Sequence, residues 1–219
     1  MRFAIGLSLL LIANASAQIV PGSDSGNYAP DEEPRYFPRG VFGIGKSDNG
    51  DFRAAWYAQH LRALKEPTLL EKASANSDLV YRFTWVRSFD HPVTVRVVVH
   101  PNGTGTLTAK MANGEGGYKP GNLIANSTRE IGAKEVRHLR NLVQVLDFWH
   151  MSPEPAPEFS LDGGQLVHLD GAQWILEASN GGDYHVVDRW SPSKGPLREI
   201  GLYMARTLGQ LDIPGNSVY

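Results

Sequence analysis

The sequence predicts an α+β domain: a two-layer sandwich in which about three helices cover a mainly antiparallel sheet. Two observations lead to this prediction. Segments with strand-like patterns follow one another through tight turns, which favours antiparallel pairing. Amphipathic segments occur in the order helix, strands, helix, strands, helix, and a helix with one apolar stripe must bury that stripe against a neighbouring layer.

The first half of the domain reads as one helix followed by a meander. Apolar side chains recur at helical spacing over residues 52–65, and Pro67 ends the pattern. Strands are predicted at residues 79–86, 93–100, 104–111 and 123–131. The turn signal Pro101-Asn102-Gly103 joins the second and third of them, and a Gly-rich loop precedes the fourth.

The second half begins with the clearest helical pattern in the chain. Between Ala133 and Trp149, apolar residues recur every three or four positions with charges on the opposite side, and the prolines from Pro153 onward end the helix. Strands are predicted at residues 165–169, 173–178 and 184–190, the last two flanking the turn signal Asn180-Gly181-Gly182. Pro196 opens a third helix that ends near Gly209.

Residues 1–17 are typical of a cleavable secretory signal peptide. Arg2 precedes an apolar run, and Ala15-Ser16-Ala17 places cleavage before Gln18. The run is about half the roughly 20 residues that a membrane-spanning helix needs. The chain has no cysteine, which excludes a lipid anchor on the processed N-terminus. We therefore expect an exported protein, periplasmic or extracellular, with no membrane span after cleavage.

Composition divides the rest into two parts. Residues 18–50 are rich in Gly and Pro and predict a flexible leader, and residues 51–219 predict a single domain. The chain carries 21 Lys and Arg against 23 Asp and Glu, so nucleic acid is a poor candidate partner. Without cysteine, disulfides and thiolate metal sites are excluded.

The alternation of the strands groups polar side chains. If the faces of neighbouring strands coincide, one side of the sheet carries four basic side chains and a carboxylate. These candidate ligand-binding residues are Arg82, Arg96, Glu177, His185 and Arg189. Such a face can receive a small anion or an acidic chain end. The alternative is a solvent-facing side of the sheet with cross-strand ion pairs.

Trp190 is the sixth candidate. It follows Asp188-Arg189 where the last strand runs into a loop, and an exposed aromatic next to a cation makes a natural contact point. Exposed tryptophans also stack on sugar rings, which suits a protein of the cell envelope.

Histidines close to carboxylates provide a second interpretation. His185 with Asp188, and His168 with Asp170, offer imidazole and carboxylate for acid–base chemistry. Residues three apart on a strand point to opposite faces, so His185 and Asp188 cannot easily serve one metal ion. We predict neither a metal nor a cofactor.

Four stretches together resemble an uncharacterised family of secreted bacterial proteins: Tyr81–Ser88, His91–Val93, Asp170–Trp174 and Tyr184–Pro192. The likeness covers about residues 52–208. It implies export and a bacterial source, but that family has no known activity, so the resemblance assigns no function.

The sequence thus favours a non-enzymatic binding or interaction module outside the cytoplasm, engaging an envelope component or another protein. The alternative is a small extracytoplasmic hydrolase that uses a histidine with a nearby carboxylate.

Overall fold

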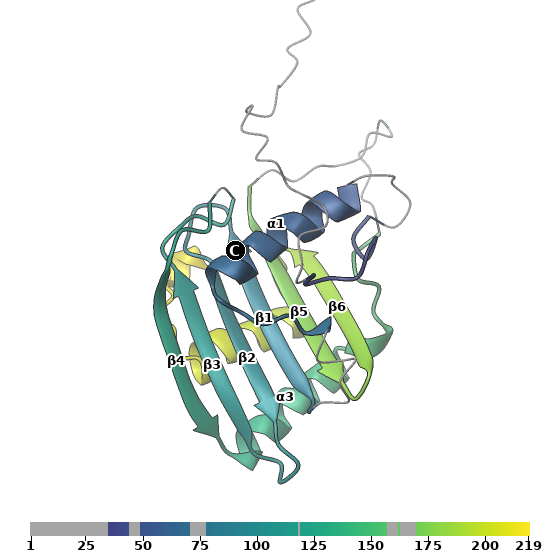
Figure 1. Cartoon of the computed structure of the whole chain (residues 1–219), viewed down its shortest axis with the longest axis vertical. Coiled ribbons are helices and arrows are strands. Elements are labelled where there is room, and N and C mark those ends of the chain that lie inside the picture. Colours follow the sequence, from purple (N-terminus) through teal and green to yellow (C-terminus); the bar gives the residue numbers. More distant parts are fainter. Residues whose placement is uncertain (1–34, 44–48, 71–77, 118, 157–161, 163–169) are drawn as a thin grey trace, which may run out of the picture.

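The computed structural model describes residues 35–43, 49–70, 78–117, 119–156, 162 and 170–219. Its strands form one antiparallel sheet in the order β4-β3-β2-β1-β5-β6 (Figure 1). The strands are β1 (Val80–Arg87), β2 (Val93–Val99), β3 (Gly105–Ala112), β4 (Leu123–Ile131), β5 (Ala172–Asn180) and β6 (Asp183–Trp190). The predicted α+β sandwich is confirmed.

Helices lie on both sides of this sheet. α1 (Asn49–Ala63) crosses the front face in Figure 1, whereas α3 (Ala133–Val145) and α4 (Pro196–Leu202) lie behind it. α4 continues into one π-helical turn, η2 (Tyr203–Leu208), and short 3-10 turns occur at η1 (Phe148–His150) and η3 (Gly215–Ser217). No helix in the described ranges is long and apolar enough to span a membrane.

The main core lies between the sheet and the layer of α3 and α4. Its centre is aromatic: the ring centroids of Trp85 and Trp174 are 4.4 Å apart, and those of Phe83 and Trp174 are 5.4 Å apart. All three side chains are fully buried. Gly201 allows α4 to approach them, because a Cβ at this position would lie 2.6 Å from Trp174 and 2.7 Å from Phe83. Any larger residue there would push α4 away from the sheet.

A second core fills the space between α1 and the other face of the sheet. It includes three aromatic side chains that precede α1, namely Tyr36, Phe37 and Phe42, all at most 4% exposed. Residues 35–43, which belong to the predicted leader, are therefore packed against the domain, because burial of these rings holds the segment there. The predicted signal peptide and the predicted strand at 165–169 lie outside the described residues.

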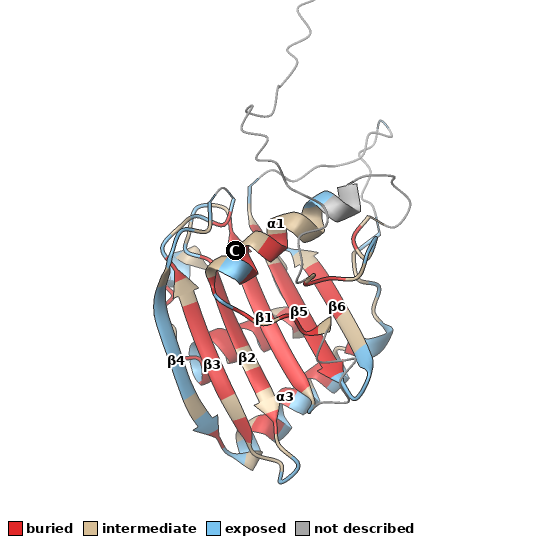
Figure 2. Cartoon of the chain, in the orientation of Figure 1, coloured by how far each residue is buried: buried red, intermediate tan, exposed pale blue. Residues whose placement is uncertain are grey.

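This second layer explains the burial of β1. Every residue from Val80 to Arg87 is buried, where the alternating pattern predicted burial mainly on one face. α1 and the segment after it cover the second face, as the red centre of the sheet in Figure 2 shows. Charged side chains on that face are therefore removed from water.

Candidate functional site

Arg82 and Glu177, two of the predicted ligand-binding residues, form a buried ion pair. The register of β1 and β5 places them directly opposite each other. Arg82 donates from Nε and Nη2 to the two carboxylate oxygens of Glu177, at 2.8 and 2.7 Å, and its Nη1 donates to the Pro67 carbonyl at 2.6 Å. Both side chains are 0% exposed. Each hydrogen-bonding group of the pair is engaged within the protein.

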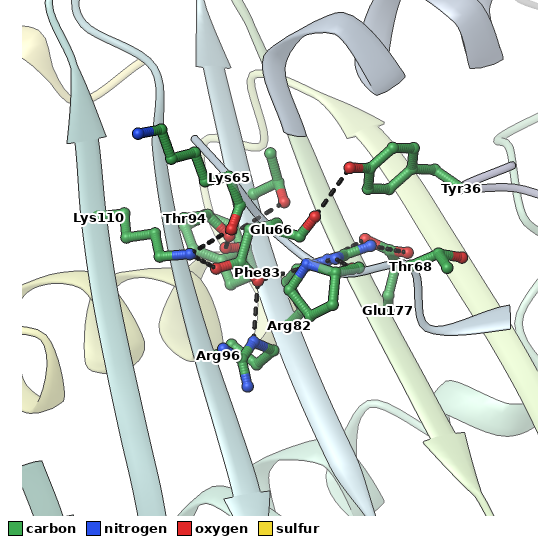
Figure 3. A network of polar contacts seen from close by, with 12 residues as sticks. Tyr36, Lys65, Glu66, Thr68, Arg82, Phe83, Thr94, Arg96, Lys110 and Glu177 are labelled. Carbon is green, nitrogen blue, oxygen red and sulfur yellow. Dashed lines mark hydrogen bonds and ion pairs between the residues drawn. The ribbon is translucent and has the colours of Figure 1, made fainter. Parts of the chain in front are cut away.

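A second carboxylate, Glu66, enters this cluster from the segment after α1 (Figure 3). It lies 2.9 Å from Nε of Arg96, 2.7 Å from Nζ of Lys110 and 3.8 Å from Nη1 of Arg82. Lys65, with a positive φ of 51°, turns the chain so that Glu66 points down onto the sheet. We call Glu66, Arg82, Arg96, Lys110 and Glu177 the buried ion cluster.

The charges of the buried ion cluster are compensated by partners within the protein. Burial lowers the pKa of Arg82, but attraction to Glu177 and Glu66 outweighs it, and the net pKa lies above the ordinary value. Burial and the Glu177 charge raise the pKa of Tyr184 well above its usual range, and its hydroxyl donates to Glu177 at 2.8 Å. Buried pairs of this kind fix the geometry of a fold, because separating either partner leaves an uncompensated charge.

The predicted open polar face is therefore wrong at its centre. Arg82, Arg96 and Glu177 do share one face of the sheet, as their alternation indicated. The segment that carries Glu66 covers that face, so Arg82 and Glu177 are closed to solvent instead of lining a concavity.

His185 and Arg189 lie on the opposite face, which corrects the predicted grouping. β6 pairs His185 with Ala178 and Arg189 with Trp174, whereas Glu177 pairs with Val186. Side chains directly opposite in an antiparallel pair point to the same face, so neither basic residue can join the face of Glu177.

Both residues instead hold the segment that follows η1. The Nε2 of His185 lies 3.0 Å from the Met151 carbonyl, and Arg189 donates to the carbonyls of Ser152 and Pro153 at 3.0 and 3.1 Å. The His185 ring packs edge-on against Phe148, with centroids 4.9 Å apart. Burial lowers the pKa of His185, so the neutral imidazole donates its Nε2 proton to the carbonyl.

Trp190 is the last residue of β6 and follows Arg189 directly. It pairs with Gln173 and is 37% exposed, so the predicted exposure is confirmed. Its ring covers Gly171, whose φ is +151° and where a Cβ would come within 2.4 Å of the Trp190 Nε1.

A concavity among the described residues lies elsewhere, beside α3 at the lower end of the sheet in Figure 1. Its volume is about 700 Å³. We call it the α3 groove. It is lined by Tyr81, Asn102, Gly103, Ala133, Val136, Arg137, Arg140, Asn141, Val143, Gln144, Asp147, Phe148, Trp149 and His150. The lining combines two arginines, three carboxamides and a 37% exposed tryptophan.

The charges of the groove are arranged along one helix. Arg137 and Arg140 are three residues apart on α3 and therefore adjacent on its surface. Arg140 hydrogen-bonds the hydroxyl of Tyr81, a residue whose pKa burial raises. The carboxylate of Asp147 accepts a 2.7 Å hydrogen bond from Nδ1 of His150, and this bond raises the pKa of His150.

The end of α3 positions the aromatic wall. α3 stops at Val145, four residues before the predicted end, and Asp147 adopts the left-handed conformation with φ 54° and ψ 41°. The chain then turns so that Phe148 is buried and Trp149 and His150 face outward. Phe148 and Trp149 rest on His185, at 4.9 and 6.1 Å between ring centroids. His185, one of the predicted site residues, thus supports the aromatic side chains of the groove wall.

The sequence pattern did not predict the groove. It predicted a longer helix with Trp149 on its buried side and the charged residues on its solvent-exposed side. The spacing of Arg137 and Arg140 was visible in the sequence, but only the turn at Asp147 brings Trp149 to the same surface.

Metal ligands do not gather in the described part of the chain, where no group of three His, Asp or Glu side chains could hold an ion. His168, the partner predicted for Asp170, lies outside the described residues. His185 and Asp188 point to opposite faces of β6, and Asp188 instead accepts a 2.7 Å hydrogen bond from the hydroxyl of Tyr57.

Comparison with known proteins gives no relative from which a role could be transferred. No family model matches the sequence, and no curated protein is significantly similar to it.

Proposed function

We propose that this chain is an exported, non-enzymatic binding module, and that its α3 groove holds an acidic saccharide of the cell envelope. The observation that carries the proposal is the pair Arg137 and Arg140 on the same concave surface as the exposed ring of Trp149. Cations select an acidic group, and an exposed indole offers a flat apolar face to a sugar ring.

The arginines favour an anionic ligand because their charges are not consumed within the protein. In the described ranges no carboxylate pairs with Arg137, and Arg140 bonds the neutral hydroxyl of Tyr81. The acid of the groove, Asp147, is engaged by His150. A carboxylate entering the groove therefore meets two adjacent guanidinium groups, and charge-assisted hydrogen bonds to such groups are among the strong ones.

The remaining lining suits a hydroxyl-rich ligand. The carboxamides of Asn102, Asn141 and Gln144 each offer both donors and an acceptor. Carbohydrate hydroxyls need that mixture, whereas a purely apolar ligand would leave these groups unpaired. An open groove, with most of its polar side chains on one helix, also leaves room for a chain that extends beyond the site.

The signal-peptide pattern of residues 1–17 supports the location. An exported protein would meet the polysaccharides of the envelope, and the acidic ones among them match the charge of the groove.

A hydrolase is the second candidate, favoured by one observation. Asp147 and His150 form an imidazole–carboxylate pair inside the groove, 2.7 Å apart. The described lining contains no Ser, Thr, Cys or Lys that the histidine could activate as a nucleophile. Both side chains are also largely exposed, so the pair lacks the water-excluded setting that acid–base catalysis favours. We therefore prefer binding without turnover.

The proposal is tested by titrating isotope-labelled protein with oligogalacturonate and, separately, with a neutral cello-oligosaccharide, while amide shifts are followed by NMR. We expect the acidic sugar alone to move resonances of α3 and of residues 147–150. Assay of the same samples for new reducing ends separates the two candidates: release of reducing ends would support the hydrolase, and unchanged spectra with both sugars would refute the binding site.

A further inference from the structure

The two edges of the sheet differ in how they are covered. The edge at β6 is occupied by the segment after η1: the Asp188 amide donates to the Pro153 carbonyl at 2.7 Å, and Arg189 reaches the Ser152 carbonyl at 3.0 Å. His185 adds its contact with Met151. A further strand cannot pair with β6 while this segment is bound.

The edge at β4 is open in the described part of the chain. β4 pairs with β3 on one side, and no described strand pairs with the other. Its residues are exposed from Ile124 to Thr128 and again at Glu130 (Figure 2). The strand is nine residues long and contains neither proline nor lysine, two of the residues that proteins use to block strand pairing at an edge, and its register shift against β3 lies near one end, between Leu123 and Ala125.

We propose that a second copy of this chain occupies this edge, pairing β4 with β4 antiparallel about a twofold axis at Ser127. Ser127 is the middle residue of Leu123–Ile131, so this register gives the two strands their longest overlap. The pairing of β4 with β3 shifts register between Ala125 and Leu123, so the regular part of the new ladder would run over residues 125–129 of both copies. The two sheets would then form one continuous sheet.

The side chains of β4 are compatible with this register. Arg129 would face Ala125 of the second copy, and Glu130 would face Ile124, which is 54% exposed in the single chain. Asn126 would face Thr128, and Ser127 would face itself. No like charges meet, whereas a pairing centred on Arg129 or on Glu130 would oppose two identical charges.

The symmetry also has a consequence for the groove. A twofold axis that pairs strands antiparallel within one sheet runs perpendicular to it, so α3 of both copies would lie on the same side. A polymeric ligand could then meet two grooves at once, which raises the apparent affinity without any new contact. The proposed pairing does not rest on the ligand, and the experiment below contains none.

Disulfide trapping tests the axis directly, because the chain has no cysteine of its own. Directly opposite residues of an antiparallel pair have Cα atoms about 4.5–5.5 Å apart, within the range that a disulfide spans. In the full chain we expect Ser127→Cys to form a covalent dimer on mild oxidation. Asn126→Cys and Val145→Cys are the controls: the first is on the same strand off the axis, and the second is exposed on α3. Equal crosslinking of all three would overturn the proposal.

Charge substitution tests the same pairing without oxidation. Ser127→Lys places two lysines face to face at the axis, and Ser127→Asp places two carboxylates there. We expect sedimentation to show dimers for the unmodified chain, monomers for each variant and dimers again when the two variants are mixed. An unmodified chain that stays monomeric at its highest soluble concentration, or a dimer unaffected by Ser127→Lys, would overturn the proposal.

Discussion

Arg82 of β1 and Glu177 of β5 lie opposite each other in the sheet and form a two-bond ion pair that solvent does not reach. Around this pair the protein gathers Glu66, Arg96 and Lys110 from three further segments. The cluster joins the segment after α1 to the sheet and closes the face that would otherwise be open. Its role is to hold the fold together, and its removal has a measurable cost.

Glu177→Gln should destabilise the protein by about 3–5 kcal/mol, because the neutral amide leaves the buried guanidinium of Arg82 without its main counter-charge. Urea unfolding measures the change in the free energy of unfolding. Lys134→Ala, an exposed position on α3, is the control and should change it by less than about 0.5 kcal/mol. A loss for Glu177→Gln as small as that of a surface ion pair would contradict a closed cluster.

Asp188 should make the protein less stable as the pH rises from about 4 to 6. Burial raises its pKa to about 6 against the opposing hydrogen bond from Tyr57 and the charge of Arg53. The folded state therefore keeps a proton that the unfolded state loses, so the contribution of Asp188 to stability falls by about 2–3 kcal/mol across this window and then stays constant. Urea unfolding of Asp188→Asn at several pH values should lack this fall. An identical pH profile for the variant would rule the assignment out.

His60 should act in the opposite direction. It is fully buried on α1, and burial lowers its pKa to about 4. Between about pH 4 and 6.5 the unfolded state binds a proton that the folded state does not, so this contribution to stability is lost as the pH falls. His60→Leu should remove this opposing contribution. The free energy of unfolding should then fall more steeply with rising pH than in the unmodified chain, because only the contribution of Asp188 remains. If His60→Leu leaves the profile unchanged, His60 is not buried in its neutral form.

The sequence predicts the strands of this structure better than it predicts the grouping of the candidate site residues. The strand boundaries follow within a residue or two, because alternation and turn residues are local signals. The length of the turn also sets the register of the β5–β6 hairpin. With a two-residue loop at Gly181 and Gly182, Glu177 pairs with Val186. His185, the neighbour of Val186, must therefore point to the opposite face of the sheet. The predicted grouping of His185 with Glu177 overlooked this signal.

Other features depend on contacts that no local pattern contains. The helical apolar pattern predicted for residues 52–65 begins at Phe52, which is 57% exposed, whereas Tyr57 is buried. Aromatic rings from the segment before α1 determine which side of the helix is buried. Phe42, for example, packs against Tyr57 with ring centroids 5.3 Å apart. Glu66 likewise reaches its partners only through the folded turn at Lys65. Contacts between residues far apart in the sequence therefore bring α1 and its flanking segments onto the sheet. These segments bury the face that was predicted to be open.

Binding of an acidic saccharide should weaken as the pH rises, because the groove loses the charge of His150. The hydrogen bond that His150 donates to Asp147 raises the pKa of His150 above its ordinary value near 6.5, so the loss occurs above that pH. Binding of oligogalacturonate measured across this range should follow a single titration. Asp147→Asn should move its midpoint to lower pH, and His150→Gln should abolish it. A dependence that survives His150→Gln would assign the titration to another group.

The most direct measurement of the proposed function is calorimetric titration of oligogalacturonate into the unmodified chain and into Arg137→Ala/Arg140→Ala. Lys134→Ala removes a cation from the same helix outside the groove and is the matched control. We expect the double variant to bind at least about tenfold more weakly, as the loss of charge-assisted hydrogen bonds requires. The control should bind as the unmodified chain does. Equal affinities for the double variant and the control, or no binding by the unmodified chain, would contradict a role for the α3 groove in binding acidic saccharides.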